Sequence, residues 1–97
     1  MMFGEHWGYN VHPVYKDWAN IYCPTLTDDR VNGFSDMREI YRELKNLEST
    51  LKDLGFKGWV LWTHLVNTHI MKILTKLKSV PFGIDLKQET IWFKKEL

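Results

Sequence analysis

Three groups of residues have types and spacings that could do chemistry. The segment Arg30-Val31-Asn32-Gly33-Phe34-Ser35 lies immediately before a long helical pattern. A loop at a helix N-terminus can direct backbone N–H groups toward an anion, and Gly33 permits the close approach that such a loop needs. Asn67 opens a second helical pattern, and His64 lies at the end of the apolar strand before it. An imidazole at that point can act as a general acid or base.

Each of these residues also has a purely structural interpretation. Gly33 is a common turn residue, and Ser35 is a favoured N-cap for the helix that follows. Asn67 is equally suited to cap the second helix. His64 can be an ordinary polar residue at a strand end. The residue types alone leave both interpretations open.

The histidines and the single cysteine predict no metal site and no disulfide. His64 and His69 are five residues apart across a predicted strand-to-helix junction, so they do not share a helix face. Neither they nor His6 and His12 belong to a cluster with the ligand spacing of structural zinc. Cys23 cannot form an internal disulfide, and it fits a reducing compartment.

The strongest predicted element is a helix from Ser35 to Leu54. Apolar residues recur there at steps of three and four, and charged residues occupy the opposite face. Gly55 follows and can adopt the left-handed conformation that closes a helix. Leu44 and Leu47 lie at the centre of the apolar stripe, so we expect both to be buried against a sheet.

The rest of the chain predicts a second helix and several strands. The apolar block Gly58–Thr63 is typical of a buried strand, and a second helix is expected over Asn67–Lys78. Shorter strand signals occur at Val11–Tyr15, Trp18–Cys23, Val80–Leu86 and Thr90–Lys95. We therefore expect one α/β domain over residues 1–97, with two main helices packed on a mixed sheet.

Composition and charge exclude several partners. The formal net charge of the 97 residues is +1, with no basic block, which gives no reason to expect a nucleic acid. The apolar run Trp59–Trp62 is too short to cross a bilayer, and the first residues do not form a signal peptide. We expect a cytoplasmic protein with no membrane partner. The many aromatic residues predict an exposed patch of Trp7, Tyr9 and Tyr15, which would mark a protein partner.

The order of these elements and motifs resembles the GNAT family of N-acetyltransferases. The acetyl-CoA loop of that family has Arg or Gln, two residues, Gly, one residue and a second small residue, at the start of the long helix. Arg30, Gly33 and Ser35 fit this pattern, and Asn67 matches an Asn that follows the next strand. The resemblance covers the chain from about Trp18 to its end. It implies a minimal GNAT-like mixed sheet.

The resemblance also implies a cofactor and its contacts. Acetyl-CoA would have its pyrophosphate held by Arg30 and by the backbone of Val31, Asn32, Gly33, Phe34 and Ser35. Its pantetheine arm would lie along the backbone at Tyr22 and Cys23, and Asn67 would orient it. His64, or a water, would carry protons between the acceptor amine and solvent.

The chain departs from the family where the general acid is expected. Leu74 stands in place of the usual Tyr, and Lys78-Ser79 replaces a Gly-Phe pair. Asp28, Asp29 and Asp36 also surround the proposed pyrophosphate site. Two functions remain open: an acyl-CoA-dependent N-acetyltransferase with weak catalysis, and a catalytically silent GNAT-like protein that binds a partner protein. Compact chains of the second kind occur among bacteriophages, which would place the protein in a host cytoplasm.

Overall fold

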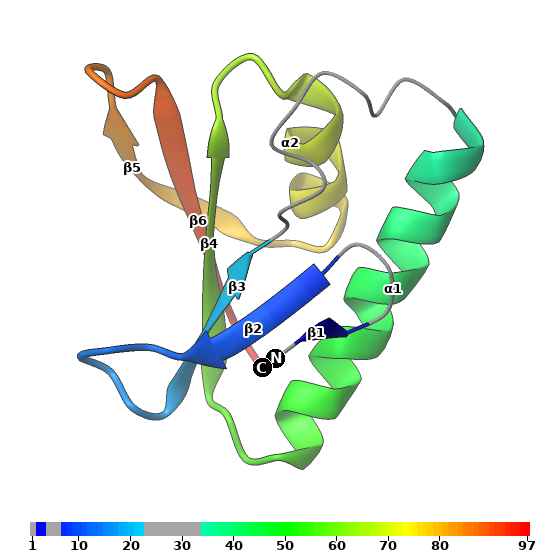
Figure 1. Cartoon of the computed structure of the whole chain (residues 1–97), viewed down its shortest axis with the longest axis vertical. Helices are drawn as coiled ribbons and strands as arrows, with labels where there is room; N and C mark the ends of the chain where they lie inside the picture. The colour runs from blue at the N-terminus through cyan, green and yellow to red at the C-terminus, as the bar shows by residue number, and fades with distance from the viewer. Residues whose placement is uncertain (1, 4–6, 23–33) are drawn as a thin grey trace.

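The computed structural model describes residues 2–3, 7–22 and 34–97, with side chains from residue 7 to 22 and from 38 onward. The chain is a small α/β domain with a mixed sheet and two helices (Figure 1). The elements follow one another as β1 (Met2–Phe3), β2 (Trp7–Val11), β3 (Trp18–Tyr22), α1 (Phe34–Asp53), β4 (Gly58–His64), α2 (Thr68–Lys76), β5 (Val80–Asp85) and β6 (Thr90–Glu96).

The strands lie in the order β1-β2-β3-β4-β6-β5. Only the β3–β4 pair is parallel, and α1 makes the crossover between these two strands. The other neighbours are antiparallel. The described part of the chain thus confirms the predicted series of strand, long helix, strand, second helix and terminal hairpin.

Both helices cover the same face of the sheet (Figure 1). Alternate strand residues such as Ile21, Leu61 and Phe93 join one apolar cluster with the inward residues of α1 and α2. Leu61 lies opposite Phe93 in the sheet register, so these side chains share a face. The opposite face of β3, β4 and β6 has no helix packed on it within the described residues.

Helix α1 confirms the prediction from periodicity. It begins at Phe34, one residue before the expected start, and ends at Asp53. Leu44 and Leu47 are fully buried, as expected. Gly55 has a φ of +92°, the left-handed conformation that lets the chain turn toward β4.

A buried polar cluster joins α1 to the covered face. Trp59 Nε1–H donates a 2.9 Å hydrogen bond to Glu48 Oε2. Lys95 Nζ lies 2.8 Å from the same oxygen and donates to Glu48 Oε1 at 3.1 Å. The carboxylate is therefore satisfied from two strands, which fixes the position of α1 over β4 and β6.

One strand prediction needs correction, and the predicted terminal hairpin is confirmed. The strand expected over Val11–Tyr15 lies instead at Trp7–Val11, and residues 12–17 form the turn into β3. His12 stabilises this turn because its Nδ1 accepts the backbone N–H groups of Val14 and Tyr15. The expected β5–β6 hairpin is present, although it lacks an Asn-Gly turn. Asp85 Oδ1 accepts two backbone N–H groups there, and Glu89 adopts a φ of 56°.

Candidate functional site

The uncovered face of the sheet carries a row of rings that crosses three strands. The centroid of Trp62 lies 5.4 Å from that of His64 and 6.4 Å from that of Trp92, and Phe82 continues the row 6.4 Å beyond Trp92. Trp62 and Phe82 are 39% and 50% exposed, which is high for large apolar side chains in a small domain. We call these four residues, His64, Trp62, Trp92 and Phe82, the ring row.

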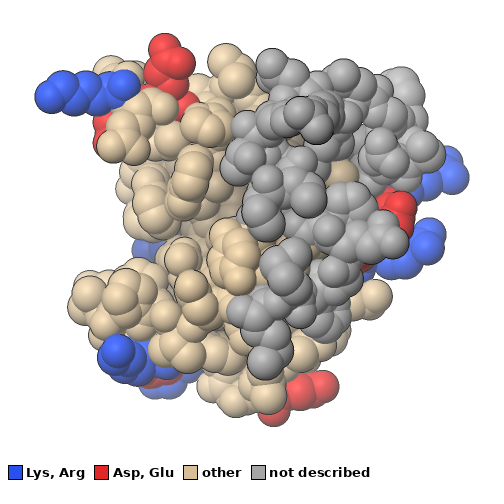
Figure 2. All heavy atoms as spheres, viewed as in Figure 1, with Lys and Arg blue, Asp and Glu red and all other residues tan. Residues whose placement is uncertain are grey.

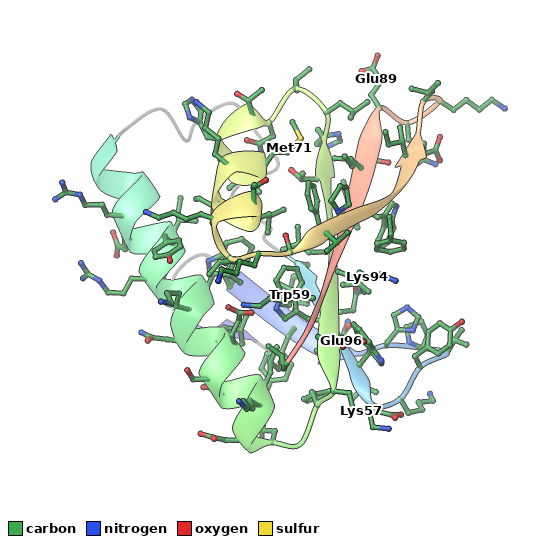
Figure 3. All side chains as sticks on the ribbon, turned by 180° about the vertical axis from the view of Figure 1, so that it is seen from behind. Lys57, Trp59, Met71, Glu89, Lys94 and Glu96 are labelled. Carbon is green, nitrogen blue, oxygen red and sulfur yellow. The ribbon has the colours of Figure 1, made fainter. Side chains whose placement is uncertain are left out.

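An irregularity in β5 presents Phe82 to this face. The β5–β6 register shifts between Pro81 and Gly83, so Phe82 is the extra residue of a bulge. Its ring lies beside Trp92 and beneath the ammonium group of Lys94, which is 5.5 Å from the ring centroid. Figure 3 shows Lys94 and Trp59 extending to opposite sides of the sheet, with Trp59 on the helix side. The bulge and the cation therefore place an aromatic ring at the edge of the open face.

A groove of about 860 Å³ runs along this face between β5 and the turn that joins β2 to β3. Figure 2 shows the molecule hollowed between two lobes on its left side. His12, Tyr15 and Trp18 line one side of the groove, and Phe82 and Val80 line the other. Tyr15 is 66% exposed, and its ring centroid lies 5.3 Å from that of His12. The backbone hydrogen bonds accepted by His12 thus also hold Tyr15 at the rim.

Two aromatic side chains of β3 lie flat over glycines on the same face. A Cβ at Gly58 would be 2.3 Å from the Trp18 ring, and a Cβ at Gly8 would be 2.4 Å from the Tyr22 ring. These glycines leave the space that the two rings occupy. The rings extend the aromatic surface from the centre of the sheet toward β2.

A strained lysine stands at one end of the groove. Lys78 follows the C-cap Leu77 of α2 and has a φ of 65°. Ser79 N–H bonds to Leu74 O and Lys78 N–H bonds to Thr75 O, the pattern of a Schellman motif. Glycine is the favoured residue at this position because a Cβ makes the left-handed conformation costly. The side chain of Lys78 instead lines the groove.

The structure describes only part of the predicted site. Tyr22 ends β3, His64 ends β4, and Asn67 is the N-cap residue of α2 without a side-chain capping hydrogen bond. Phe34 and Ser35 form the first turn of α1. The predicted cofactor residues Cys23, Arg30, Val31, Asn32 and Gly33 lie outside the described residues.

The carboxyl ends of the parallel strands β3 and β4 bear on the predicted site. The β3–β4 pairing ends at Ile21 and Leu61, whereas β4 continues to His64 beside β6. Helices α1 and α2 follow the carboxyl ends of these two strands, which is where ligands bind in many α/β sheets. Tyr22 and His64 both extend toward the uncovered face. The predicted catalytic residue therefore lies at one end of the ring row.

The position of the missing general acid is buried. Leu74 is 0% exposed and belongs to the cluster between α2 and the sheet. A tyrosine at this position would have to fit into a close-packed core. The burial of Leu74 therefore argues against Leu74→Tyr as a way to introduce a proton donor.

The predicted exposed patch is largely wrong, and the observed groove was not anticipated. Trp7 is fully buried and its Nε1–H donates to Ile40 O, while Tyr9 packs against the core and Phe56. Only Tyr15 of that set is exposed. A usable signal was present in the sequence: two helices cannot cover both faces of a wide sheet, and Trp62 and Trp92 alternate with the buried residues of their strands.

No protein-family model matches this sequence, and no curated protein matches it. Among the described residues, no His, Cys, Asp and Glu side chains gather into a group of three or more that could hold a metal ion. Neither described helix is long and apolar enough to cross a membrane.

Proposed function

We propose that this chain is a catalytically silent, GNAT-like protein that acts in the cytoplasm by binding a partner protein through the uncovered face of its sheet. The observation that carries the proposal is the ring row beside an open groove. Contiguous exposed aromatic surface of this kind usually marks an interaction site, and aromatic residues are enriched at the centres of protein interfaces. This face offers Trp62 and Phe82 as anchors.

The strand connections support the GNAT-like part of the proposal. The parallel pair β3 and β4, joined through α1, is followed by α2 and an antiparallel hairpin whose last strand lies next to β4. This is the order that the sequence resemblance implies. Lys78, which stands where the family would have a glycine, also adopts the left-handed conformation that glycine favours.

The burial of Leu74 supports the absence of catalysis. The helix position from which the family's proton donor would act faces the core, so it presents no side chain to a substrate. Positioned acid–base catalysis is worth roughly 10²–10⁴-fold in rate, and a chain without it would transfer acyl groups slowly.

The proposal is tested by measuring binding and catalysis on the same folded protein. Incubation with acetyl-CoA and a panel of amines should release free CoA no faster than buffer alone. A partner isolated by affinity capture and then purified should bind the wild-type chain and lose at least tenfold in affinity for Phe82→Ala. Lys72→Gln, an exposed change on α2, should leave that affinity unaltered. A purified partner that binds Phe82→Ala and wild type equally would refute the proposed surface.

A second candidate is an N-acetyltransferase, and the extension of β4 beyond β3 favours it. Acetyl-CoA would supply the activated acyl group when bound. The described residues fit acetyl-CoA in one respect. Helices α1 and α2 begin beyond the ends of the parallel strands, and the N–H groups at a helix N-terminus favour phosphate. The resemblance assigns the pyrophosphate to the Arg30–Ser35 segment, and His64 would accept a proton from the amine. Rapid CoA release that is lost in His64→Ala and in Gly33→Asp would favour this candidate.

A further inference from the structure

We infer that the groove of the uncovered face binds an extended, acidic, proline-containing segment of the partner. This inference rests on the proposed function and specifies the chemistry of the ligand. It follows from the aromatic side chains on both sides of the groove, the charge at the groove and the strain at Lys78.

Aromatic side chains line both sides of the groove. Tyr15 and Trp18 lie on one side and Phe82 lies on the other, so the groove presents rings across its width. Proline-rich segments dock between aromatic side chains, because their polyproline II helix presents a ridged, preorganised shape.

The charges at the groove favour an acidic ligand. Lys78 and Lys94 are exposed and line it, whereas the carboxylate among the lining side chains, Glu96, lies on β6 opposite Gly58. Lys95 also borders the groove, but its ammonium group binds Glu48 on the covered side. The contact with the Phe82 ring holds the Lys94 ammonium beside the aromatic surface. A glutamate between prolines would therefore meet two ammonium groups.

Lys78 provides an independent argument. Its left-handed backbone conformation favours glycine, so a lysine there lowers the stability of the fold. Strained residues of this kind concentrate at functional sites. Here the strained residue lines the groove, which gives Lys78 a role in binding rather than in folding.

The test is a calorimetric titration of the full chain with a synthetic peptide that alternates glutamate and proline. We expect saturable binding, and no binding of the matched peptide that alternates lysine and proline. The double variant Lys78→Gly/Lys94→Gln should bind the acidic peptide about tenfold more weakly, since each exposed charge pair is worth up to about fivefold. Phe82→Ala should weaken it by at least tenfold. Lys72→Gln on α2 is the control and should bind as wild type does.

Four results would overturn the inference. These are absence of binding by the acidic peptide, equal binding of the basic peptide, tighter binding of a single-stranded oligonucleotide, and self-association that Phe82→Ala abolishes. Because Lys78→Gly relieves backbone strain, loss of binding in that variant cannot be attributed to unfolding. If the peptide does not bind but a purified partner still requires Phe82, the acidic ligand is refuted and the proposed binding surface stands.

Discussion

The two faces of the sheet differ in the burial and the contacts of their aromatic side chains. Trp59 and Trp62 lie three residues apart on β4 and extend to opposite faces. Trp59 is fully buried, and its Nε1–H donates to Glu48 beneath α1. Trp62 is 39% exposed, and its ring lies beside those of His64 and Trp92. The comparison separates residues that stabilise the fold from residues whose exposed surface is available for binding.

The covered face shows what a completed interface looks like in this chain. Its apolar residues form one buried cluster, and the buried Glu48 carboxylate has hydrogen-bond partners on both β4 and β6. The uncovered face has the same kind of aromatic residues, and no described helix packs on it. We therefore expect substitutions on the two faces to affect different measurements: stability on the covered face and binding on the uncovered one.

The largest expected effect on stability comes from replacing Trp59. Trp59→Ala removes the largest buried side chain of β4 and leaves Glu48 with one partner fewer, so it should cost about 3–5 kcal/mol in the free energy of unfolding. Trp62→Ala, on the same strand, should cost about 1 kcal/mol. Urea denaturation measures both. Equal losses would mean that the two faces are equally important for folding.

Leu44 tests the centre of the α1 stripe. Leu44→Ala should lower the free energy of unfolding by about 2–5 kcal/mol because it leaves a cavity between α1 and the sheet. Leu54 is a matched control, since it is 59% exposed at the end of the same helix. Leu54→Ala should change stability by no more than about 0.5 kcal/mol. A thermal midpoint of Leu44→Ala equal to that of wild type would show that the stripe is not buried.

Gly58 tests the packing of Trp18 on the uncovered face. A Cβ at Gly58 would meet both the Trp18 ring at 2.3 Å and Lys95 O at 2.6 Å, so the added methyl group cannot be accommodated by a side-chain movement alone. Gly58→Ala should cost about 1–3 kcal/mol in the same denaturation experiment. Gly83 has no atom within 4 Å of an added Cβ, and Gly83→Ala should be close to neutral. Similar losses for both glycines would contradict the close packing at Gly58.

The smallest expected effect is a gain in stability when Lys78 is replaced by glycine. Lys78→Gly should raise the free energy of unfolding by about 1 kcal/mol because glycine adopts the left-handed conformation without strain. Lys78→Ala keeps the strain and removes the charge, so it should give no such gain. If the alanine variant is stabilised as much as the glycine variant, the gain comes from charge and not from backbone conformation.

The sequence predicted the helices better than it predicted the site. The three- and four-residue steps of α1, and the alternation of helices and strands, are local patterns with strong physical causes. The turn at residues 12–17 depends on an imidazole nitrogen that accepts two backbone N–H groups, which no periodicity reveals. The ring row depends on which face the helices leave open. The continuous apolar block of β4 predicts a strand covered on both faces, and this is wrong for one face, because Trp62 and Val60 lie on the open side.

The central claim is that the uncovered face, and not the helix side, contacts the ligand. The five tryptophans allow a direct test, because each indole N–H gives its own NMR signal. Trp18, Trp62 and Trp92 lie on the uncovered face, whereas the indoles of Trp7 and Trp59 donate to Ile40 O and Glu48 inside the core. On titration with the glutamate–proline peptide, we predict that the signal of Trp18, which lines the groove, moves most. The signal of Trp92, whose ring lies beside Phe82, moves with it, while those of Trp7 and Trp59 stay in place. Movement confined to Trp7 and Trp59, or no movement of the uncovered-face signals at saturating peptide, would contradict the account.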